Sequence, residues 1–84
     1  MELKKFLDQN GVWCERIYHE NRKKWKKIKL YNMAHSKGDV GMIKKISGFI
    51  HKHHKGKVTW HTVTGLNKRT GHTTWSLVFR LYRD

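Results

Sequence analysis

The spacing of apolar residues changes at Gly56, and this change limits the folds that the chain can adopt. Before Gly56, apolar residues recur every three or four positions, which is typical of a helix with one buried face. After Gly56, they recur at every second position, which is typical of a strand with one face on a core. The two patterns together predict a small α+β domain.

Residues 39–55 carry the strongest helix pattern. Asp39 can cap the start of this helix, and Gly56 follows its end. Lysines and histidines in the last turn complement the helix dipole. The residues expected on the buried face are Val40, Ile43, Ile46, Phe49, Ile50 and His53.

Residues 57–82 predict an antiparallel hairpin. Val58 and Trp60 share one face of its first strand, and the apolar positions of the second strand are Trp75, Leu77, Phe79 and Leu81. Residues 65–71 have a glycine at each end and the composition of a hairpin loop. We expect paired strands over about 57–64 and 72–82.

The first third of the chain contains one helix pattern and one ambiguous segment. Leu3, Phe6 and Leu7 predict a short helix that stops at Asn10 and Gly11. Residues 12–34 form an apolar stripe if helical, but the polar run 19–24 interrupts that stripe. If residues 12–33 form a hairpin instead, Trp13 and Ile17 alternate on one strand and Ile28 and Leu30 on the next, and the polar run 19–24 is the loop between them. Aromatic and β-branched residues favour the hairpin.

An alternative architecture resembles a winged helix, in which a helix is followed by a basic hairpin. The helix–turn–helix that should precede these elements is not visible in the sequence. The chain of 84 residues is expected to form one domain over 1–84, with a small core. The single cysteine, Cys14, excludes an intrachain disulfide, and neither a membrane span nor a signal peptide is apparent. We expect a cytoplasmic protein, with association to the nucleoid or the ribosome as options.

The charge of the chain is strongly one-sided. Its net charge is +13, and no acidic residue occurs between Val40 and Arg83. Because such charge opposes a compact fold through self-repulsion, a polyanionic partner is expected, and nucleic acid is the first candidate. Lysine outnumbers arginine, which favours contacts to phosphates and modest sequence specificity.

Three basic segments are the candidate binding residues. The helix over 39–55 carries lysines and two glycines opposite its apolar face: Lys44, Lys45, Lys52, Lys55, Gly41 and Gly48. The tip of the C-terminal hairpin carries Lys68 and Arg69. A third cluster surrounds Trp25, which either packs in the core or stacks on a base: Arg22, Lys23, Lys24, Lys26, Lys27 and Lys29. A helix and a basic hairpin suit duplex grooves, so duplex DNA is expected ahead of RNA.

The sequence gives less support for metal binding, catalysis or membrane binding than for binding to nucleic acid. The six carboxylates are not clustered for Mg²⁺, and no cofactor or metal is expected, although His51 and His54 have a spacing that metal ligands use. No enzymatic activity is expected; metal-independent RNA cleavage by His, Lys, Arg and Tyr stays open as the one enzymatic interpretation. The main alternative is an adaptor or inhibitor that docks on an acidic protein surface, such as that of a polymerase or nuclease. A membrane partner is not expected, because the core needs the isoleucine face of the helix.

Overall fold

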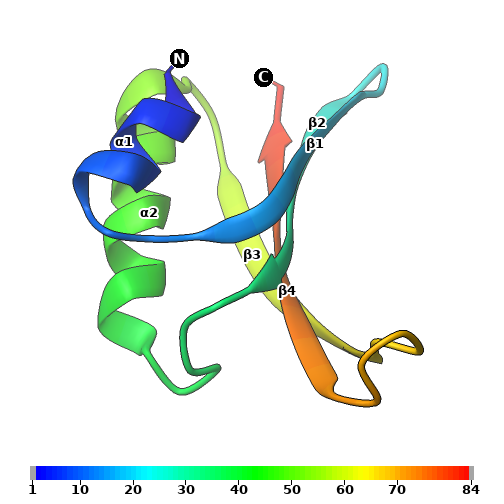
Figure 1. Ribbon diagram of the computed structural model, residues 1–84. Helices are drawn as coiled ribbons and strands as arrows, with labels where there is room; N and C mark the ends of the chain where they lie inside the picture. Colours follow the sequence, from blue (N-terminus) through cyan, green and yellow to red (C-terminus); the bar gives the residue numbers. More distant parts are fainter. Residues whose placement is uncertain (1, 84) are drawn as a thin grey trace.

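The computed structural model describes residues 2–83 and has two helices on one side of a four-stranded antiparallel sheet (Figure 1). The elements are α1 (Leu3–Gln9), β1 (Cys14–Asn21), β2 (Trp25–Met33), α2 (Val40–His53), β3 (Val58–Leu66) and β4 (Thr73–Tyr82). The strand order is β1-β2-β4-β3, so β4 lies between β2 and β3. The predicted α+β domain is confirmed.

The predicted hairpin over 12–33 is confirmed, with a shorter turn than expected. β1 and β2 are paired from Cys14 opposite Met33 to Asn21 opposite Lys26. The turn is closed by the backbone N of Arg22, which donates to the carbonyl of Trp25 at 2.8 Å. Backbone pairing therefore continues through most of the polar run, because the ladder needs no apolar side chain. Trp13 precedes the strand and is 59% exposed.

Helix α2 confirms the predicted cap and most of the predicted face. The side chain of Asp39 accepts a hydrogen bond from the backbone N of Met42 at 3.0 Å. Two residues expected inside, Val40 and His53, are exposed, because they are the first and last residues of the helix and the buried stripe covers only its middle. Gly56, with φ of +125°, lies in the following loop rather than directly at the helix end.

The C-terminal hairpin is confirmed, and β3 extends two residues beyond its expected end. Gly65 lies within β3, and Leu66 is paired with Thr73. Asn67 organises the turn: its backbone N donates to the carbonyl of His72 at 2.8 Å, and its side chain accepts from the backbone N of Arg69 at 3.0 Å.

The core lies between the helices and the sheet. Its centre consists of fully buried residues of the two central strands and α2: Ile28, Leu30, Leu77, Phe79, Ile43, Ile46 and Ile50. Leu3 and Leu7 of α1 are buried in the same core. Ile17 of β1 and Val58 of β3 are partly buried and pack against it, so the edge strands also contribute. All six elements contribute to this cluster, so residues 2–83 share one core.

The winged-helix alternative is wrong for the described residues. The β1–β2 hairpin separates the two helices along the chain, so residues 2–83 contain no helix–turn–helix. Neither helix in the described part of the chain is long and apolar enough to cross a membrane.

Candidate binding surfaces

The lysines of α2 lie on its solvent side. Lys44, Lys45 and Lys52 are exposed, and Lys55 is exposed just beyond the helix end. Gly41 and Gly48 are exposed as well. A Cβ at Gly48 would meet nothing within 4 Å, and one at Gly41 would meet only the Asp39 carboxylate at 3.8 Å. Packing within the chain therefore requires neither glycine.

The two basic hairpin tips lie at opposite ends of the sheet (Figure 1). Lys23 and Lys24 are exposed in the β1–β2 turn, next to the end of β4, because Trp25 is paired with Tyr82. Lys68 and Arg69 are exposed in the turn that precedes β4. The structure does not bring these two tips together.

The predicted cluster Arg22–Lys29 does not form one surface. Ile28 and Leu30 point into the core, so strand alternation places Lys27 and Lys29 on the opposite face of β2. Lys26, paired with Leu81, lies on the side of the helices. Trp25 shares the face of Lys27 and does not pack in the core.

The face of the sheet opposite the helices, here called the outer sheet face, was largely missed by the sequence analysis. Both helices pack on the other side (Figure 1), and no helix among residues 2–83 covers it. Strand alternation assigns to it Arg16, Tyr18, Glu20, Trp25, Lys27, Lys29, Tyr31, Thr59, His61, Val63, Ser76, Val78, Arg80 and Tyr82. The signal was present in β2, where Trp25, Lys27, Lys29 and Tyr31 alternate with core positions.

Aromatic rings on the outer sheet face are in contact with cations. The Tyr31 centroid lies 4.5 Å from the Arg16 guanidinium carbon and 4.4 Å from the Lys29 ammonium. The Trp25 ring has Arg80 at 5.2 Å and Arg22 at 5.8 Å. Such contacts contribute about 0.5–1 kcal/mol each at exposed sites. The rings therefore restrict where these cations lie.

The cations of the outer sheet face outnumber its available carboxylates. Glu20 forms an ion pair with Arg22 at 2.8 Å, and Glu15 accepts a hydrogen bond from the side chain of Asn32. The pKa of the Tyr82 phenol is lowered, first by a hydrogen bond with Arg80 and then by one with Thr59. Hydrogen bonds favour the ionised phenolate, and the charges of Arg80 and Lys57 lower the pKa of Tyr82 by a smaller amount.

A groove of about 410 Å³ lies at the end of the outer sheet face next to the β3–β4 turn. Its lining combines Lys29 and Tyr31 of β2 with Lys68 and Arg69 of the turn. Asn32, with φ of +50°, donates its backbone N to the hydroxyl of Ser76 at 3.1 Å in the same region. The groove thus joins the outer sheet face to one of the tips predicted from sequence.

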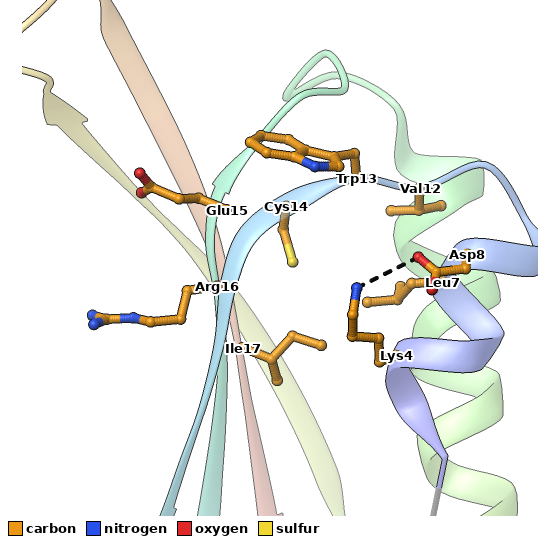
Figure 2. A pocket seen from close by; sticks show the side chains of 9 residues that line it. All are labelled: Lys4, Leu7, Asp8, Val12, Trp13, Cys14, Glu15, Arg16 and Ile17. Atoms are coloured by element: carbon orange, nitrogen blue, oxygen red, sulfur yellow. Dashed lines mark ion pairs between the residues drawn. The ribbon is translucent and has the colours of Figure 1, made fainter.

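Two other groups that could carry chemistry are Cys14 and the histidine pair His51–His54. Figure 2 shows the Cys14 thiol pointing toward α1, in a cavity of about 230 Å³ that Lys4 and Asp8 also line. Burial raises the pKa of this thiol, which makes it a poor nucleophile at neutral pH. The Nε2 atom of His54 lies 2.8 Å from the carbonyl oxygen of Tyr82, which occupies one nitrogen of the candidate His51–His54 pair. Residues 2–83 contain no group of three potential metal ligands.

Comparison with known proteins does not narrow the function. The chain matched no protein-family model, no curated protein and no solved structure. The function is therefore inferred from the surfaces described above.

Proposed function

We propose that this protein binds nucleic acid, mainly through contacts between its lysines and arginines and the phosphate backbone. The observation that carries the proposal is the excess of unpaired cations. The chain has 19 lysines and arginines, and the ion pairs within residues 2–83 are Lys4–Asp8 and Arg22–Glu20. A polyanion that neutralises such cations releases its counterions, which is a large source of binding free energy.

The composition of the basic residues supports modest sequence specificity. Lysine is a flexible point charge that contacts phosphate, whereas arginine forms bidentate bonds to base edges. Lysines make up most of the basic residues, including all those on the solvent side of α2. Binding to unrelated sequences should therefore differ by less than about a thousandfold, the low end for specific binders.

Duplex DNA was expected because α2 and the basic tip of the β3–β4 hairpin could contact the same groove of a duplex. Figure 1 has α2 and the turn at 67–72 on opposite sides of the molecule. This separation weakens the argument for a groove reader, while the charge argument is independent of the form of the nucleic acid. The proposal therefore covers duplex DNA, single strands and RNA, and the form is an outcome of the test.

Fluorescence anisotropy tests the proposal on nuclease-treated protein. Duplex DNA, single-stranded DNA and duplex RNA are titrated across a salt series. We expect a Kd of about 1 μM or tighter at low salt for at least one form, with log K falling linearly with log salt concentration. Weak binding to all three, insensitive to salt, would overturn it.

Docking on an acidic protein surface is a second candidate, favoured by exposed apolar side chains. Trp13, which precedes β1, is 59% exposed, and Leu66, which lies at the end of β3 and lines the groove there, is 65% exposed. Aromatic residues rimmed by cations suit protein interfaces as well. An affinity pull-down with and without nuclease distinguishes the candidates: a stoichiometric acidic partner that survives nuclease treatment supports docking, and complete loss supports nucleic acid.

A further inference from the structure

We infer that the outer sheet face is the binding surface and that its ligand is a single strand of nucleic acid. This inference rests on the proposed function, and it adds the surface and the form of the ligand. Four observations carry it: the spacing of residues along β2, the width of the sheet, the contacts between rings and cations, and the groove at one end.

The outer row of β2 has the order aromatic, lysine, lysine, aromatic. Trp25, Lys27, Lys29 and Tyr31 occupy every second position, so neighbours are about 6.6 Å apart and the two rings about 20 Å apart. Surfaces that bind single strands combine rings on which bases stack with cations that follow the backbone. This row provides both kinds of group on one face, with two lysines for phosphates between two rings for bases.

The width of the sheet argues against a duplex at this face. Strands lie about 4.8 Å apart, so the outermost of four strands are about 14 Å apart before side chains are added. The major groove is about 12 Å wide and admits a helix or a two-stranded ribbon. The sheet is therefore too broad to enter a groove, and its rings cannot reach bases that are stacked inside a duplex.

The contacts between rings and cations on the outer sheet face hold flat groups in place on which bases can stack. Arg16 lies against Tyr31, and Arg80 lies against Trp25. A base can stack on a guanidinium plane as well as on a ring. Since the rings already restrict these cations, less side-chain entropy is lost when the strand binds.

The groove next to the β3–β4 turn provides a place for one unstacked nucleotide. Its volume of about 410 Å³ falls within the range of small-molecule sites. Lys68, Arg69 and Tyr31 line it, and so does Glu15, whose carboxylate accepts a hydrogen bond from the Asn32 side chain. The side-chain oxygen of Asn67 accepts from the turn amides, so hydrogen bonds to a base edge would come from its Nδ2 and from the side-chain oxygen of Asn32. A strand that follows β2 from Trp25 to Tyr31 therefore ends in this groove.

The test removes rings and charges separately. Tyr31→Leu and Trp25→Leu keep the charge, and each is expected to weaken binding of a short oligothymidine about five- to hundredfold, the loss of one stacked base. The double variant Lys27→Ala/Lys29→Ala is expected to lower the salt slope by about 1.4, at about 0.7 for each single-strand phosphate contact. The control is the double variant Lys44→Ala/Lys52→Ala on α2, which removes the same charge. It should lower the salt slope by less than half of the change expected for Lys27→Ala/Lys29→Ala.

The results of this test distinguish a failure of the inferred surface and ligand form from a failure of nucleic-acid binding itself. Wild-type affinity in both ring variants, a larger slope change from the α2 pair, or tighter binding to duplex than to oligothymidine would each overturn the inference while nucleic-acid binding stands. A wild-type protein that binds no nucleic acid at any salt concentration would overturn both. Because both rings lie outside the core, the variants should fold, as circular dichroism can verify; Tyr31→Phe, which keeps the ring, should retain wild-type affinity.

Discussion

The ring of Phe6 in α1 stacks on the ring of Phe49 in α2, with centroids 4.2 Å apart and an angle of 14° between the planes. The ring of His53 also contacts Phe49, with centroids 4.6 Å apart and a tilt of 56° between the planes. A helix of seven residues is not stable by itself, so α1 depends on this stack and on the burial of Leu3 and Leu7. The position of α1 is thus a product of tertiary contacts.

Phe6→Ala should lower the free energy of unfolding by about 2–3 kcal/mol, because a half-buried ring loses both its apolar burial and its aromatic partner. Urea denaturation followed by far-UV circular dichroism measures this change. Lys5→Ala, at an exposed neighbouring position, should stay within about 0.5 kcal/mol of the wild type. Equal stability of the two variants would contradict the role of the stack.

Gly48→Ala should stabilise the protein by about 0.5–1 kcal/mol, because alanine removes the entropic penalty of an interior helical glycine and its Cβ meets no neighbour. Thermal unfolding measures the gain, and Gly41→Ala is the matched variant on the same side of α2. Affinity for nucleic acid should not change if the outer sheet face binds the ligand. A more stable variant that binds more weakly would instead indicate close contact at α2.

Acidification should destabilise the protein partly through His19. Desolvation and then the charge of Lys26 lower the pKa of His19, while Glu2 and Lys4 line the same cavity. As the pH falls below about 6.5, the unfolded chain takes up a proton at this residue before the folded chain does, so stability decreases. Urea denaturation at pH 7.5, 6.0 and 5.0 should show a smaller loss for His19→Gln. Parallel profiles for the two proteins would contradict the assignment.

Cys14 should react slowly with a thiol reagent in the folded protein. Its thiol is half-buried and its pKa is raised by burial, so little thiolate is present at neutral pH. Reaction with a disulfide reagent at pH 7.5, with and without urea, should be faster in the unfolded chain. Equal rates would show that the thiol is accessible and that the pocket in Figure 2 does not protect it.

The helix α2 and the C-terminal hairpin were predictable because their signals are local. Ile43, Ile46 and Ile50 repeat with the helical period, and Asp39 is a cap that needs no distant partner. The exposure of Val40 and His53 was not predictable, because the period does not say where the sheet ends beneath the helix. The boundaries of β1 were missed for a similar reason, since backbone pairing with β2 extends through polar residues.

Some of the candidate binding residues were likewise predictable from local patterns, whereas others depended on the tertiary structure. The sequence alone determined that the chain is basic and that lysines lie opposite the isoleucines of α2, because both follow from composition and local period. Local alternation along β2 also places Trp25 and Tyr31 on one face with Lys27 and Lys29. Only the tertiary structure decided that both helices pack on the opposite face and that the distant residues Arg16 and Arg80 lie beside the two rings. That arrangement depends on the strand order and on both helices packing on one side of the sheet. These are long-range relationships, and no local pattern in the chain encodes them.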